Sequence, residues 1–216
     1  MTDAVDISTI TYREATTDDL EAIATLYTHH WCNYVPDPAD KMLAAKNCVL
    51  AQLVRSPLTI VAEQDGALVG VCMGCVIPGG QVPEDPRWRP IFDEVYAQAT
   101  ERAKTADERL EGQLFGDLRE LVKADEFIAT GSPYAEAQLN LFMVEPWLIG
   151  AGVGGELFSR MKGLMRQAGA SRFFLMTDTA SNWAYYEHRD MVRIWERYDV
   201  PDDPTSWGAL MYGGTL

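Results

Sequence analysis

The chain has 216 residues, which is the length of one ordinary domain or of one domain with a large insertion. Apolar residues make up 47% of it and charged residues 23%, a composition that excludes a disordered or fibrous protein. The 18 basic and 32 acidic residues give a formal net charge of −14, which argues against nucleic acid or a membrane surface as a partner and would attract a small cationic substrate.

The first residues, MTDAVDIST, have neither a basic start nor an apolar stretch, so we expect a cytoplasmic protein without a signal or transit peptide. Capping residues, apolar periodicity and turn signals then predict five elements. They are a strand over residues 10–13, a helix that begins at Leu20, a helix over 39–55, and strands over 58–63 and 67–77 that form a hairpin around Asp65 and Gly66.

Cys72 and Cys75 form a CxxC pattern inside the last of these strands. Residues three apart in a strand point to opposite faces of the sheet, so the two thiols cannot hold one metal ion together. We therefore expect both to be structural residues, and we expect no metal site.

Residues 81–130 differ in composition from the strands on either side. Gly and Pro residues lead from the preceding strand into the segment, and two stretches with helical apolar spacing follow. We expect a helical pair inserted within a single domain that spans residues 1–216.

The remaining chain predicts a second alternation of strands and helices. The expected elements are strands over residues 135–144, 171–177, 191–200 and 209–213 and helices over residues 152–168 and 180–189. The order is mixed α/β with some strands paired as hairpins, which does not suit a fully parallel, doubly wound sheet.

Residues 149–155, IGAGVGG, support two chemical interpretations. Gly150, Gly152 and Gly155 fit the GxGxxG dinucleotide fingerprint, but Pro146 interrupts the strand that should lead into it, and Asp178 falls late for a ribose ligand. The other interpretation is an anion site, in which successive backbone N–H groups and the helix dipole hold a pyrophosphate.

With the second interpretation the sequence resembles the GNAT acyltransferase superfamily. Residues 149–154 match the coenzyme A loop pattern Gln/Arg-x-x-Gly-x-Gly/Ala at both glycines, while Ile149 departs at the first position. The opening ITYREATTDDLEAIATLY and the hairpin match the family's first elements, and residues 182–191 resemble its late Asn…Tyr-Glu-x-x-Gly-Phe motif, with Asp190 and Met191 in place of Gly and Phe. Residues 81–130 have no counterpart in the family.

The resemblance implies an α/β fold of the mixed α+β type. Its central, mostly antiparallel mixed sheet would splay apart after the fourth strand, at Val144, and would be flanked by helices. The implied activity is transfer of an acetyl or short acyl group from acetyl-CoA to a primary amine of a small molecule or peptide, by direct attack in a ternary complex.

The resemblance also implies roles for individual residues. Tyr186 would protonate the departing thiolate, and Trp31, Tyr34 and His30 would contact the acceptor. Coenzyme A would be held by Met143, Val144, Ile149, Gly150, Ala151, Gly152, Val153, Gly154, Gly155 and Asn182.

The general base is open at this stage. Glu136, Gln138 and Asn140 share one strand face at period two, and Glu136 is the ionisable one, although Gln138 is the position that aligns with the family's glutamate. We take Glu136 as the candidate, with a water relay, His29 or His30 as alternatives.

Two other functions remain possible from the sequence. One is a catalytically silent acyl-CoA-binding or sensor domain of the same fold, and the other is a dinucleotide-binding oxidoreductase. We also expect the inserted helices to form a lid beside the acceptor site or the interface of a homodimer.

Overall fold

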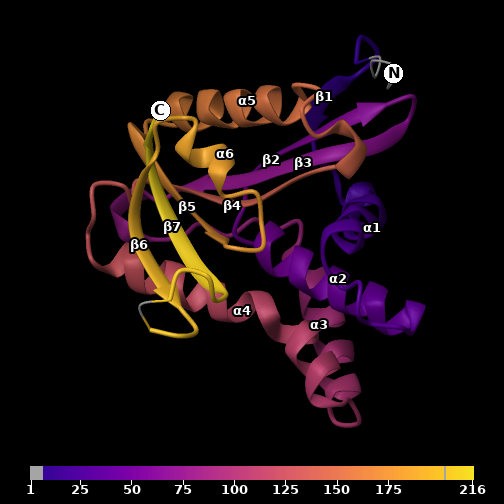
Figure 1. Cartoon of the computed structure of the whole chain (residues 1–216). Coiled ribbons are helices and arrows are strands. Elements are labelled where there is room, and N and C mark those ends of the chain that lie inside the picture. Colours follow the sequence, from indigo (N-terminus) through magenta and orange to yellow (C-terminus); the bar gives the residue numbers. More distant parts are fainter. Residues whose placement is uncertain (1–6, 202) are drawn as a thin grey trace.

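A seven-stranded sheet forms the centre of the fold in the computed structural model, which describes residues 7–201 and 203–216, apart from the side chains of Asp117 and Arg119 (Figure 1). Its strands are β1 (Thr11–Glu14), β2 (Leu58–Gln64), β3 (Ala67–Val76), β4 (Ala137–Val144), β5 (Arg172–Asp178), β6 (Val192–Tyr198) and β7 (Gly208–Thr215). They lie in the order β1-β2-β3-β4-β5-β7-β6, and β4 and β5 form the one parallel pair. The expected mixed, mostly antiparallel sheet is confirmed. The oxidoreductase alternative is wrong, because a dinucleotide-binding domain requires an open parallel sheet.

Helices cover both faces of this sheet. They are α1 (Leu20–His30), α2 (Pro38–Leu53), α3 (Arg89–Ala103), α4 (Glu108–Ala129), α5 (Val153–Gln167) and the short α6 (Ala184–Glu187). Helix α5 packs against β2, β3 and β4 on one face, while α1, α2, α3 and α4 gather below the opposite face (Figure 1). None of the described helices is both long and apolar enough to cross a membrane.

Residues 81–130 contain α3 and α4, and both helices pack into the main core. Trp88, directly before α3, is fully buried in the cluster that contains α1 and α2. The Asn47 side chain of α2 donates to the Leu114 carbonyl of α4 (2.7 Å), and Arg55 forms an ion pair with Asp125. The segment therefore belongs to the main core, and its removal would expose the apolar face of α2. The expected lid or dimer interface stays a prediction.

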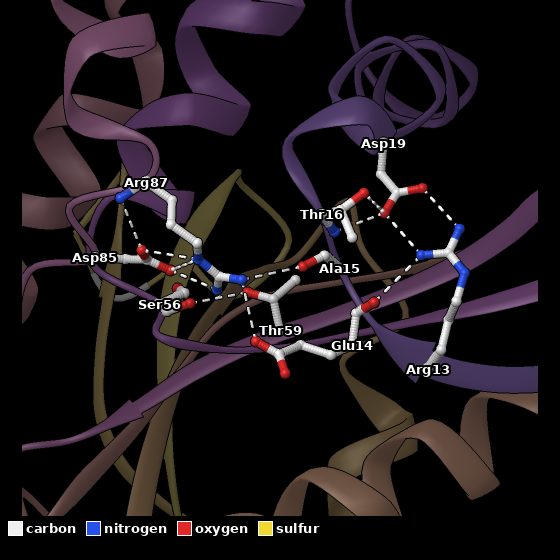
Figure 2. Close-up of polar contacts among 9 residues, drawn as sticks. All are labelled: Arg13, Glu14, Ala15, Thr16, Asp19, Ser56, Thr59, Asp85 and Arg87. Atoms are coloured by element: carbon white, nitrogen blue, oxygen red, sulfur yellow. Dashed lines mark hydrogen bonds and ion pairs between the residues drawn. The ribbon is translucent and has the colours of Figure 1, made fainter.

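Charged side chains fix the start of this segment to the first strand (Figure 2). The Arg87 guanidinium donates to the buried Asp85 carboxylate (2.7 Å) and to the Ala15 carbonyl (3.3 Å). Arg13 on β1 forms a second ion pair, in which both of its terminal nitrogens contact the Asp19 carboxylate at 2.8 Å. The Arg13 guanidinium accordingly lowers the pKa of Asp19.

A β-bulge in β4 decides which side chains meet at the centre of the molecule. Leu139 pairs with Gly74 and Leu141 with Met73, so Asn140 is the extra residue. The bulge reverses the alternation of faces. Leu139 packs on the α5 side, whereas Leu141 packs among α1 and α2, so Asn140 does not continue the simple period-two pattern that the sequence predicts.

The parallel pairing of β4 with β5 is short. It joins Gln138 to Phe174 and Leu139 to Leu175, and no further pair follows. The two strands therefore separate from Asn140 onward, inside β4 and earlier than Val144, where we expected the sheet to divide.

Cys72 and Cys75 lie on opposite faces of β3, as their spacing predicts. Cys72 packs in the cluster under α5, and Cys75 packs against Ala124 and Ile128 of α4. Burial raises the pKa of both thiols, that of Cys75 to about 11.

Candidate functional site

The separation of β4 from β5 opens a cavity of about 930 Å³. One end is lined by the turn before α5 and by residues around α6. The other end is lined by residues of α1, α2 and α4, and side chains of β4 and β5 form the walls between. The cavity thus passes through the sheet where backbone pairing has been interrupted.

The glycine turn presents a row of backbone donors at one end of the cavity. Gly150 (φ 86°) and Gly152 (φ 94°) have left-handed conformations that favour glycine, and α5 begins directly afterwards. In the described part of the chain, no hydrogen bond is made by the backbone N–H groups of Gly150, Gly152, Val153, Gly154 and Gly155. Together with the positive end of the helix dipole, these donors form an anion site.

The predicted coenzyme A residues are mostly brought together here. Met143, Val144, Ile149, Gly150, Gly152, Gly154, Gly155 and Asn182 line the cavity. Ala151 and Val153 do not line it, because their side chains pack toward the core under α5. Ile149 is 66% exposed and supplies no polar group to the anion site.

Backbone groups of β4 face the opening between the strands. The Glu145 N–H donates to the Val69 carbonyl (2.9 Å), which directs the peptide groups of Glu145 toward β3. Hydrogen bonding alternates along an antiparallel pair of strands. The backbone N–H and C=O groups of Met143 therefore also point to β3, while those of Phe142 and Val144 point to the opening. The backbone of Phe142, and not that of Met143, therefore faces the opening together with that of Val144.

Tyr185 and Tyr186 both line the cavity but have different surroundings. The Tyr185 hydroxyl donates to the Gly154 carbonyl (3.3 Å), and the Arg189 guanidinium lies 4.0 Å from the centre of its ring. Tyr186 packs on Tyr212 (5.7 Å between ring centres), and its hydroxyl has no hydrogen-bond partner among the described residues. Burial raises the pKa of Tyr186, which keeps the phenol protonated at neutral pH.

His30 contacts the last residue of β4. Its Nε2 is 2.9 Å from the Val144 carbonyl oxygen, which can only accept, so Nε2 carries the hydrogen and Nδ1 keeps a lone pair. Burial lowers the pKa of His30, so the ring is neutral near pH 7. The neighbouring His29 is turned to the Glu145 carboxylate at 3.0 Å.

Glu136 is placed outside the cavity. It precedes β4, and its carboxylate accepts hydrogen bonds from the backbone N–H groups of Ser171 (2.7 Å) and Arg172 (3.1 Å). The prediction of a catalytic Glu136 must therefore be corrected, because these bonds fix the carboxylate at the start of β5 instead of at the site.

Aromatic side chains and one face of α4 form the other end of the cavity. Trp31 packs against Tyr27, and the Tyr34 hydroxyl donates to the Gln113 side chain of α4. Gly112 and Gly116 lie one turn apart on α4, and a Cβ atom at either would meet nothing within 4 Å. The predicted acceptor residues Trp31, Tyr34 and His30 thus lie together.

Sequence reasoning missed the α4 residues and Arg189. An NH2 nitrogen of Arg189 lies 3.2 Å from where a Cβ of Gly155 would be, which puts a guanidinium at the first turn of α5. The available signal was an arginine two residues after Glu187, inside the late motif of a strongly acidic chain.

Comparison with solved structures identifies the fold. SsHAT matches with a TM-score of 0.61 and 17% identity, over 96% of this chain and 98% of that one. A mutant agmatine N-acetyltransferase in its apo form matches with a TM-score of 0.54 and 16% identity, over 97% and 100% of the two chains. The ribosomal-protein-S18-alanine N-acetyltransferase of Escherichia coli matches with a TM-score of 0.54 and 15% identity, over 96% and 94%.

No protein-family model matches the sequence, and no curated protein matches it significantly. The structural matches span nearly the whole length of each chain. The chain therefore has the fold of the GNAT N-acetyltransferases.

Proposed function

We propose that this protein is an N-acetyltransferase that moves an acetyl or short acyl group from acetyl-CoA to a primary amine. The observation that carries the proposal is the row of unpartnered N–H donors at the start of α5, placed at one end of a cavity between two separated strands. A pyrophosphate fits such donors. A pantetheine arm can continue along β4, where the Phe142 backbone and the Val144 N–H face the opening and the Val144 carbonyl is held by His30.

The reaction needs a group that accepts a proton from the amine and one that gives a proton to the thiolate. The amine nitrogen forms a bond to the acyl carbon and the carbon–sulfur bond breaks. His30 Nδ1 takes the proton that leaves the nitrogen, and the Tyr186 hydroxyl gives its proton to the departing sulfur. The neutral states of both side chains suit these roles.

The acceptor binds at the end of the cavity formed by α1 and α4. Trp31 and Tyr34 provide aromatic surface there, the two α4 glycines leave room, and Glu120 adds a carboxylate to the lining. With a net charge of −14, the chain favours a cationic small molecule over an acidic one. Solved structures of the same fold include an agmatine and a polyamine N-acetyltransferase.

A thermal-shift assay with acetyl-CoA, NAD, NADP and FAD tests the proposal, and acetyl-CoA alone should raise the Tm. Gly152→Glu should remove this rise, because its carboxylate would occupy the place of the anion at the helix start. Gly169→Glu is the matched control, since Gly169 (φ 97°) has the same backbone strain at the far end of α5. Equal acetyl-CoA binding by the two folded variants would refute the glycine-turn assignment.

An acyl-CoA sensor without turnover is the second candidate. The observation that favours it is the position of Glu136, which leaves the cavity without the glutamate base that we expected. Release of free CoA in the presence of a panel of amines supports the enzyme. Tight binding of acetyl-CoA without release across the panel supports the sensor.

A further inference from the structure

A row of basic side chains begins at the anion site and continues along α5. Lys162 and Arg166 lie about two and three turns after Gly155, so all three residues share one face of α5. Arg189 approaches the same face from the end of α6, where its NH2 lies beside Gly155 and its guanidinium lies 5.8 Å from the ring centre of Phe158. Side chains on a helix tilt toward its N-terminus, which brings Lys162 toward Arg189.

These cations lack acidic partners, although the chain has an excess of carboxylates. Of the three, none forms an ion pair with any residue that the structure describes. Arg160, on the same helix, is by contrast paired with Glu156 at 2.8 Å. Partial burial lowers the pKa of Lys162, and the charges of Arg166 and Arg189 lower it further.

A group of basic side chains without acidic partners attracts anions. The pyrophosphate of coenzyme A occupies the glycine turn in the proposed function, and the same ribose that carries the pyrophosphate on its 5′ carbon carries a phosphate on its 3′ carbon. This second phosphate must therefore lie near the pyrophosphate, and the Arg189 guanidinium lies beside the glycine turn at Gly155.

We propose that Arg189 and Lys162, with Arg166 behind them, form a subsite for the 3′-phosphate of coenzyme A and make the protein selective for the phosphorylated cofactor. The inference rests on the proposed function.

Calorimetric titration with CoA and with 3′-dephospho-CoA at low ionic strength tests the subsite. The wild-type protein should bind CoA about tenfold more tightly, a modest factor because exposed cations are partly screened. Arg189→Gln should lower the affinity for CoA by about the same factor and leave the affinity for dephospho-CoA within about twofold. Lys162→Gln should act in the same direction.

Arg197→Gln is the matched control, because Arg197 lies on β6 and also lacks an ion pair among the residues described. It should leave both affinities unchanged. Equal wild-type affinity for the two ligands would overturn the subsite while leaving the proposed function intact. Equal losses of both ligands in Arg189→Gln would assign Arg189 to the pyrophosphate and overturn it too. Failure of the wild type to bind either ligand would refute the proposed function and the subsite with it.

Discussion

Gly112 and Gly116 should set the size of the amine that the protein accepts. Glycine in the middle of a helix costs about 0.5–1 kcal/mol relative to alanine. Both residues have ordinary helical conformations, and a Cβ atom at either would meet nothing within 4 Å, so neither backbone strain nor close packing requires glycine there. The space that side chains would fill at these two positions is part of the cavity between β4 and β5.

The perturbation is Gly116→Leu, with Gly163→Leu as the control. Gly163 lies in the middle of α5, has equally open space around it and does not line the cavity. Both changes should raise the free energy of unfolding by several tenths of a kcal/mol, since leucine is a better helix former than glycine. Gly116→Leu should in addition fill part of the cavity near α4.

Steady-state kinetics on primary amines of increasing size provides the assay. Each methylene that no longer fits is worth about 1–3 kcal/mol, so kcat/KM for the larger amines should fall about tenfold or more in Gly116→Leu. Acetyl-CoA affinity and turnover of the smallest substrate should stay near wild type. If Gly116→Leu and Gly163→Leu have the same acceptor profile, α4 does not bound the acceptor and the reasoning fails.

Two further predictions concern the proton transfers. Tyr186→Phe removes only a hydroxyl and should lower kcat by about 10² to 10⁴-fold, with little change in acetyl-CoA affinity. Tyr185→Phe is the control and should leave kcat nearly unchanged. The opposite ranking of the two variants would exchange the roles of the two tyrosines. His30 loses its function as base when it is protonated, and burial lowers its pKa, so kcat/KM should fall only as the pH drops below about 6.5. That acid limb should vanish from the pH profile of His30→Gln, and a limb that persists would exclude His30.

The glycine turn was predictable because its sequence requirement is local. Gly150 and Gly152 have positive φ angles that other residues rarely adopt, and the helix after them follows from its own periodicity. The order of the predicted elements also indicated antiparallel hairpins and argued against a fully parallel sheet. The fold was therefore accessible from short motifs taken in the correct order.

The position of the base was not predictable in this way. Period-two alternation placed Glu136 and Asn140 on one face, but β4 begins only at Ala137 and Asn140 occupies a bulge. Both features depend on pairing with neighbouring strands, which a single sequence does not specify. Arg189 was missed for a similar reason, since only the tertiary structure brings the end of α6 against the first turn of α5.

The burial of the four cysteines has a practical consequence for every measurement of turnover. Thiols react with disulfide chromogens as thiolates, and here all four side chains are enclosed in the core, with the pKa values of Cys72 and Cys75 raised. The folded protein should consequently be silent toward such a reagent. Any colour that develops after mixing would come from the thiol of released coenzyme A, so a continuous assay needs no correction for protein thiols. Unfolding would appear in the same assay as a sudden rise of up to four equivalents of reactive thiol per chain.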